Sequence, residues 1–491
     1  MAIRSRRTVK VALAASACVL LAACGSAVPP SQFIEAQNNL GGVGQGGNGS
    51  NAPGAFSTGT STAGPNGSIR SSGSTGSNGG SNGGSNGGSN GGSNGGSNGA
   101  SNPGNAAAGI TAGSCAGFKN GPGITNSTIT LANVADVSGP VPGLFAGVQQ
   151  AMKAYVAYFN SSSSICGRKL ALQALDSQTS SSGDQQASTS ACSGAFAMVG
   201  SMGAFDDGGA QTVTNCGIPD LRTAATEQAR INSPVVFGAQ SLNASYVPTS
   251  PADYYKKAFP GVQDKAAFLY LNAGAASLNA HDEIKGWEAR GFHFVYTAGI
   301  DVSAFNYTTY VSAMQAKGVK YVQFVGAYQY AVRLAQAIQS QSSFRPVFVL
   351  DPVAYDPGYV KSGGSAVEGT HIWINSRTFE EANSIPEMQT YLSWLSRVAP
   401  GAAPNYFGIF AWSAGKLFTQ EAIKLGGKLT RASMIAALKG VDNWTGNGMF
   451  GPQHVAKKVT GSCYGFITLK GGKWVREGPA PFSCGTVTKV A

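Results

Sequence analysis

The chain has 491 residues, of which 68 are glycine and only 12% are charged. Four basic residues lie in the N-terminal stretch before Cys24, so removing this stretch lowers the formal net charge from +11 to +7. The sequence has no run of Lys and Arg interleaved with aromatic residues. A net charge of +7 spread over a long chain, without such a run, argues against nucleic acid as a partner.

The N-terminal residues 1–23 predict an export signal peptide, which takes no part in the fold. Basic residues precede an apolar run that ends at Leu21, and the run is shorter than the ~20 residues that a membrane-spanning helix needs. The stretch "LAAC" then resembles the lipobox of bacterial lipoproteins, which predicts lipidation of Cys24. Cys18 is a weaker candidate, and an ordinary signal peptide is the other alternative. "SRRTVK" (5–10) partly resembles a twin-arginine signal, so the export route stays open, with unfolded export favoured.

Residues 24–113 predict a disordered tether. They are mostly Gly, Ser, Asn, Ala and Pro, and residues 77–96 repeat the unit "SNGG" five times. Such a composition cannot bury enough apolar surface to offset the entropy of ordering. A Gly-rich coil of about 90 residues has an r.m.s. reach of roughly 50 to 55 Å. The segment would therefore hold a globular domain clear of a membrane to which Cys24 is anchored.

The cysteines that remain after Cys18 and Cys24 form an even set of six, which outside the cytoplasm suggests disulfides. Six cysteines allow 15 connectivities, and the sequential set is favoured here: Cys115 with Cys166, Cys192 with Cys216, and Cys463 with Cys484. The last pair is the safest, because the residues between its members predict two strands around the turn Gly471-Gly472. The set contains no CxxC pair and the histidines are scattered, so we expect no metal site.

The remaining residues alternate short apolar runs with amphipathic helical patterns. The first run, 129–134, precedes a predicted helix that carries Leu144, Val148, Met152 and Val156 on one face. Further strands are expected at 169–175, 195–200, 217–222 and 235–239, and a second set at 266–272, 292–298, 319–326 and 346–351. A strand at 369–375, helices through 409–427 and 431–440, and a terminal hairpin follow.

Strands that alternate with helices twice over predict an α/β fold of two doubly wound, flavodoxin-like lobes joined by a hinge. We expect lobe 1 to comprise residues 114–246 and 376–448, and lobe 2 to comprise residues 247–375 and 449–491. In open sheets of this kind, ligands bind beyond the carboxyl ends of the strands. The loops that follow the strands are therefore the candidate site.

These loops carry a resemblance to the type I periplasmic binding proteins of the leucine/isoleucine/valine group. It rests on the order of "NVADVSGPVPGL", "FAMVGSMGA", "TAAT" and "FVGAYQYA" along a two-lobe pattern. The resemblance implies that Gly203 and Ala204, the backbone of Ala224 and the hydroxyl of Thr226 hold a ligand carboxylate. It places Leu144 where the leucine-binding relatives have an aromatic side chain against the ligand, and Tyr328 where they have a tyrosine near the ligand amine. The other candidate ligand residues are Asp351, Ser138 and Ser201. Two departures from the family pattern are Ala204 in place of a serine and the lack of a glutamate after "PVFVLD".

The resemblance implies a lipid-anchored solute-binding protein of an ABC importer, outside the cytoplasm, with a small solute and a membrane permease as its partners. The solute would be amino-acid-like or another small carboxylate-bearing molecule. A sensor lipoprotein that feeds a membrane receptor is the alternative, and a secreted enzyme is a weaker one. "GGSNG" matches the G-x-S-x-G pattern only within a flexible repeat, which cannot supply the strained turn of a nucleophile elbow. No cofactor is expected.

Overall fold

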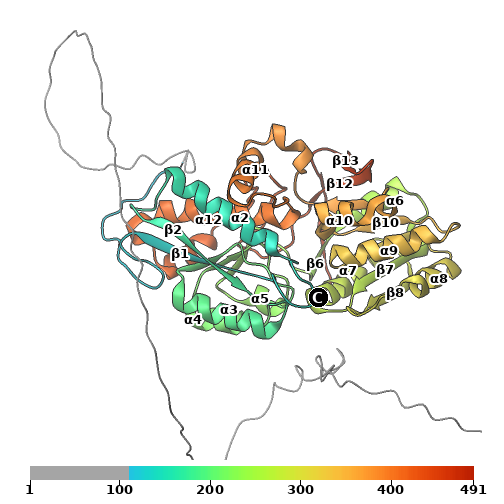
Figure 1. Ribbon diagram of the computed structural model, residues 1–491, viewed down its shortest axis with the longest axis horizontal. Helices are drawn as coiled ribbons and strands as arrows, with labels where there is room; N and C mark the ends of the chain where they lie inside the picture. The colour runs from blue at the N-terminus through green and yellow to red at the C-terminus, as the bar shows by residue number, and fades with distance from the viewer. Residues whose placement is uncertain (1–109) are drawn as a thin grey trace, which may run out of the picture. The chain divides into compact units, whose positions relative to one another are not determined.

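The computed structural model describes residues 110–491, which contain two large β-sheets and a two-stranded ribbon (Figure 1). The predicted signal peptide, Cys24 and nearly all of the predicted tether lie outside the described residues. The last residues of the predicted tether are described: Ile110 packs against the core, and the Gly113 N–H donates to the Ile423 carbonyl at 3.0 Å. Among the described residues, no helix is both long enough and apolar enough to cross a bilayer.

The first sheet is parallel and has the strand order β2-β1-β3-β4-β5. Its strands are β1 (Thr128–Ala135), β2 (Lys169–Asp176), β3 (Ala197–Val199), β4 (Asp220–Arg222) and β5 (Val236–Gly238). The connecting helices are α2 (Ala146–Ser162), α3 (Ser181–Gly194), α4 (Ala210–Cys216) and α5 (Gln228–Asn232). Later in the chain, α11 (Pro386–Val398), α12 (Tyr406–Leu425) and α13 (Arg431–Leu438) return to this sheet.

Both faces of this sheet are covered because its strands alternate apolar side chains between two clusters. Ile129 and Leu131 of β1 pack with α2 and α12, whereas Ala132 and Val134 pack on the side of α3 and α4. Figure 1 shows α12 beside α2. Helix α12 is buried along most of its length, so it forms the centre of the apolar layer on its face.

The second sheet has the strand order β13-β12-β11-β10-β9-β7-β8. Its parallel part consists of β7 (Ala266–Leu271), β8 (Phe294–Ile300), β9 (Tyr321–Val325), β10 (Val347–Leu350) and β11 (His371–Ile374). The antiparallel strands are β12 (Cys463–Lys470), β13 (Lys473–Glu477) and β14 (Ser483–Cys484), while β15 (Val487–Lys489) pairs with β6 (Tyr246–Pro248). The helices are α6 (Thr249–Ala258), α7 (Gly274–Glu288), α8 (Thr308–Ala316), α9 (Tyr328–Ser340) and α10 (Pro357–Gly363). Short 3₁₀ turns lie at Gln263–Lys265, Pro352–Ala354, Gly364–Val367, Phe379–Ser384 and Gly426–Lys428.

The fold class predicted from the sequence is confirmed: two α/β sheets occur in the expected order. The predicted strands and the helices of the first half match the observed elements to within a few residues. The elements that were not predicted from the sequence include helices α5, α6, α10 and α11 and the small β6–β15 ribbon.

The connections between the two sheets are fastened to one another by buried polar side chains. The Gln453 side chain accepts from the Ser241 N–H at 3.0 Å and donates to the Gly451 carbonyl at 2.7 Å. The Tyr406 hydroxyl accepts from Gln240 at 2.7 Å and donates to Asn375 at 2.5 Å. These hydrogen bonds join three segments: the one that follows β5, the one that follows β11 and the one that precedes β12. The three segments that connect the sheets at the hinge are therefore linked by hydrogen bonds.

All three predicted disulfides are confirmed: Cys115–Cys166, Cys192–Cys216 and Cys463–Cys484. The terminal pair forms as the hairpin argument requires. Strands β12 and β13 flank the Gly471-Gly472 turn, and Cys463 lies opposite Cys484 in the register of β12 with β14.

Candidate solute-binding site

Two backbone hydrogen bonds join the two lobes near the carboxyl edges of their sheets. The Ala275 N–H at the start of α7 donates to the Ala204 carbonyl, which follows β3, at 2.9 Å. The Tyr406 N–H at the start of α12 donates to the Tyr355 carbonyl, which follows β10, at 3.3 Å. The loops after the strands of both sheets are therefore brought together, as the sequence analysis expected of a binding site.

The loop after β3 is fixed by hydrogen bonds within the first lobe. The Ala204 N–H donates to Asp136 Oδ2 at 2.8 Å, and Asp136 Oδ1 accepts from the Ser177 hydroxyl at 2.6 Å. The Thr226 hydroxyl donates to the Gly203 carbonyl at 2.7 Å. Gly203, Ala204 and Thr226, which are predicted to hold a carboxylate, thus lie close together. Their hydrogen bonds in this structure are made to other residues of the chain.

Asp206 fixes the loop after β4 in the same way. Its two carboxylate oxygens accept from the N–H groups of Thr226 and Glu227, each at 2.9 Å, and its side chain is fully buried. Burial raises the pKa of Asp206 to about 6, although the nearby Arg222 and Arg230 guanidinium groups act in the opposite direction. The Ala224 N–H donates to no acceptor within residues 110–491.

Asp206 belongs to a buried network of ion pairs. Arg222 Nε lies 3.4 Å from Asp206 Oδ2, and Arg222 Nη1 lies 3.3 Å from Asp220 Oδ2. Arg230 joins Asp220 at 2.8 Å and Asp184 at 3.3 Å. All five side chains are almost completely inaccessible to solvent. Since a buried charge is tolerated only when it is paired, the network fixes the base of the predicted ligand loops.

The two predicted serines have different surroundings. The Ser201 hydroxyl is fully buried and accepts from the Val134 N–H of β1 at 3.0 Å. The Ser138 hydroxyl lies in an exposed loop and donates to Asp176 Oδ2 at 2.6 Å. Leu144 is partly buried just before α2, next to the edge-to-face pair of Phe145 and Phe407, whose ring centroids are 5.3 Å apart.

In the second lobe, Tyr328 opens α9 and its hydroxyl lies against the start of α10. A Cβ on Gly358 would lie 2.3 Å from this oxygen, so a larger residue at this position would displace the Tyr328 side chain. Burial raises the Tyr328 pKa, and the negative charge of Asp356 raises it further. Asp351 directly follows β10, and burial raises its pKa to about 8.

The candidate residues predicted from the sequence did not include Asp136, Asp206, Asp356 and Asn405. Asp356 caps α10 by accepting from the Gly358 N–H at 2.7 Å, and the Asn405 side chain also bonds to it. Asn405 in turn caps α12, and its amide lies 2.2 Å from where a Cβ on Gly147 would stand. Asp136 lies just after a predicted strand, and that position was the available signal, whereas Asp356 follows the end of β10 only after a 3₁₀ turn at Pro352–Ala354.

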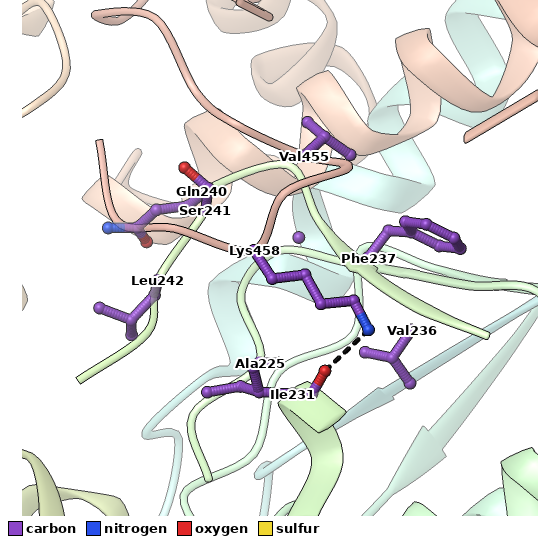
Figure 2. Close-up of a pocket in the computed structure, with 10 residues that line it drawn as sticks. Ala225, Ile231, Val236, Phe237, Gln240, Ser241, Leu242, Val455 and Lys458 are labelled. Atoms are coloured by element: carbon purple, nitrogen blue, oxygen red, sulfur yellow. Dashed lines mark hydrogen bonds between the residues drawn. The ribbon is translucent and has the colours of Figure 1, made fainter. Parts of the chain in front are cut away.

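A small hollow lies behind the loop after β4 (Figure 2). It contains about 250 Å³ of empty space, including the part open to solvent, and is lined mainly by apolar side chains such as Ile231, Phe237 and Val455. The Lys458 ammonium donates to the carbonyls of Ile231 and Ser233 at 2.8 and 2.5 Å. Burial lowers the Lys458 pKa to about 8. None of the predicted ligand residues lines this hollow.

Within the described part of the chain, no group of three or more His, Cys, Asp or Glu side chains is placed to hold a metal ion.

The two doubly wound lobes, with loops that meet at their carboxyl edges, define a two-lobed binding protein of the type I periplasmic class. The chain belongs to the periplasmic binding protein family, whose sequence model matches residues 128–473. No curated protein sequence matches the chain significantly.

Solved structures share the fold at low sequence identity. A fatty acid ABC transporter substrate-binding protein from Thermomonospora curvata is 17% identical, with a TM-score of 0.63 over 76% of this chain and 95% of its own. The leucine-binding protein LivK from Thermotoga maritima is 13% identical, with a TM-score of 0.59 over 71% of this chain and 98% of its own. A solute-binding protein from R. palustris in complex with benzoate is 16% identical, with a TM-score of 0.59 over 74% of this chain and 98% of its own.

Proposed function

We propose that this protein is the lipid-anchored solute-binding component of an ABC importer, which captures a small solute between its two lobes outside the cytoplasm. The observation that carries the proposal is the meeting of loops from both sheets at their carboxyl edges, in a chain that belongs to a family of binding proteins. A solute that touches both lobes stabilises the closed arrangement, because only that arrangement offers both sets of contacts.

The proposed contacts come from both lobes. Ser138, Leu144, Ser201, Gly203, Ala204, Ala224 and Thr226 would contribute from lobe 1, and Tyr328 and Asp351 from lobe 2. The lobe boundaries are those expected from the sequence, residues 114–246 with 376–448 and residues 247–375 with 449–491. The buried network of Asp206, Arg222 and Asp220 supports this proposal, because it presents the loop after β4 in one fixed geometry.

The proposed solute is small and amino-acid-like, or another carboxylate-bearing molecule. The solved relatives include proteins described as binding leucine, benzoate and fatty acid. In lobe 1 the Ala224 N–H has no acceptor within residues 110–491 but is buried, so the loop after β4 would have to open before it could donate to a carboxylate. The Thr226 hydroxyl would have to leave the Gly203 carbonyl. In lobe 2 the Tyr328 hydroxyl would receive the other end of the solute.

The proposed anchor is a lipid on Cys24, and the proposed tether is the segment 24–113. The permease partner follows from the importer role. With roughly 50 Å of reach, the tether would let the folded lobes find a permease in the same membrane.

Mass spectrometry of small molecules released from the purified, denatured protein tests the solute proposal. Each released compound is returned to solute-free protein in a calorimetric titration. One small molecule that binds at one site per chain would support the proposal. The proposal fails if no compound from the extracts or from a panel of amino acids, benzoates and fatty acids binds the refolded protein.

A further inference from the structure

The peptide groups on both sides of the Ala204 α-carbon are held by opposite lobes. Its N–H donates to Asp136 of the first lobe at 2.8 Å. Its carbonyl accepts from Ala275 of the second lobe at 2.9 Å. Asp136 is only 1% exposed and also accepts from Ser177. The loop after β3 is therefore fixed by contacts within the first lobe, which do not depend on the second lobe.

The partner segment at the start of α7 is built for a close approach. Gly274 has φ of +49°, a left-handed conformation that favours glycine. A Cβ on Gly274 would lie 2.5 Å from the Ala204 carbonyl oxygen and 3.1 Å from the Phe205 ring. Any side chain here would therefore press against the first lobe when the lobes meet.

The Ala275 N–H has no partner within its own helix, because the first N–H groups of a helix lack an acceptor one turn earlier. Within residues 110–491, the Ala275 N–H donates to the Ala204 carbonyl. Its hydrogen bond therefore exists only while the lobes are in contact.

We infer that Ala204 and the Gly274–Ala275 start of α7 form a latch that holds the lobes together without any solute. The Ala204 N–H and carbonyl then serve closure, so only its methyl group would take part in the proposed contact with the solute. The inference goes beyond the proposed function, since it uses the two-lobe contact and no property of the solute. One backbone hydrogen bond favours the closed form by about two- to tenfold over the equilibrium that the other contacts set.

Amide hydrogen exchange of the full chain tests the latch at single-residue resolution. The protein is unfolded in guanidinium chloride without reductant, separated from small molecules and refolded. The exchange of the Ala275 amide, relative to its intrinsic rate, is compared with that of Thr309. Thr309 is the matched internal control, because it occupies the same position at the start of α8 and its N–H has no acceptor among the described residues.

The latch predicts that Ala275 exchanges at least about threefold more slowly than Thr309, within the range expected for one hydrogen bond. Gly274→Ala should abolish this difference, while the amide of Ala280 inside α7 stays protected and shows that the lobe is folded. Gly318→Ala is the matched control variant, because Gly318 has φ of +66° and its Cβ would meet nothing within 4 Å. It should leave the protection of Ala275 unchanged.

Equal exchange of Ala275 and Thr309 in the unsubstituted chain would overturn the inference, and this comparison needs no variant. Protection of Ala275 that persists in folded Gly274→Ala protein would also overturn it. Because no solute is present, either result leaves the proposed function untouched.

Discussion

Asp206→Asn tests whether the predicted ligand loops are held by the buried carboxylate beneath them. The carboxylate accepts two backbone N–H groups, from Thr226 and Glu227, and lies beside Arg222. An asparagine amide has one oxygen, so it can accept from only one of the two N–H groups. Its NH₂ group would face the other N–H, which would lose its acceptor.

The expected loss of stability follows from these contacts. A hydrogen bond to a charged acceptor contributes about 1.5 to 3 kcal/mol, and an unsatisfied buried donor costs a similar amount. Arg222 keeps Asp220 as a partner, so the full cost of an unpaired buried charge does not apply. We therefore expect Asp206→Asn to lower the free energy of unfolding by about 2 to 4 kcal/mol.

Guanidinium unfolding at pH 7.5, followed by tryptophan fluorescence without reductant, measures this loss. Asp264→Asn is the control, because Asp264 is exposed and, among the described residues, its carboxylate accepts only from the neighbouring Gln263 side chain. The control should lie within about 1 kcal/mol of the unsubstituted protein. If the two variants unfold at the same denaturant concentration, Asp206 does not support the loops as described.

Three further predictions concern the anchor, the tether and a buried acid. Cys24→Ala should release the protein from cells into the medium, as followed by immunoblotting, and unchanged membrane retention would reject the lipid anchor. Deleting residues 77–96 should leave the melting temperature of the folded part unchanged, and a clear decrease would mean that the repeat packs against it. Burial and the adjacent Asp207 raise the pKa of Glu227 to about 9, so the folded protein retains a proton that the unfolded chain releases near its ordinary pKa. Stability should therefore fall as the pH rises from about 5 to 9, by up to ~1.4 kcal/mol per pH unit for this group. Glu227→Gln should flatten this slope in denaturation experiments at pH 5.5, 6.5 and 7.5, and a parallel slope would contradict the assignment.

The sheets could be predicted from the sequence because each parallel strand is a short apolar run bounded by turn residues. "AAFLYL" and "YVQFV" are buried on both faces and became β7 and β9. The Cys463–Cys484 pair could be predicted because a hairpin is a local structure whose turn fixes its register. The class of fold and the terminal disulfide thus depend on neighbouring residues alone.

The bonding of the site could not be predicted in the same way, because it depends on residues distant in the chain. Ala204 meets Asp136 and Ala275, which lie 68 and 71 positions away. The spacing of Asp220 and Arg222 in a short strand places both on one face, yet nothing local indicates Asp184, Asp206 or Arg230 as their partners. Helix α11 was not predicted for a related reason. The Glu387 carboxylate on its buried face accepts from Trp412 Nε1 at 2.7 Å and from Asn447 Nδ2 at 3.1 Å, so this face carries a charged residue where an apolar one is expected.

Calorimetry of solute binding to Tyr328→Phe shows whether one solute is held between the two lobes. Loss of a hydrogen bond whose partner stays buried costs about 1 to 3 kcal/mol, which is roughly five- to a hundredfold in affinity. Tyr330→Phe is the matched control, because this neighbouring hydroxyl on α9 bonds to the Val302 carbonyl at 3.1 Å within its own lobe. We expect weaker binding for Tyr328→Phe, and for Thr226→Val on the opposite lobe, with unchanged binding for Tyr330→Phe. Unsubstituted affinity in both Tyr328→Phe and Thr226→Val would contradict this expectation.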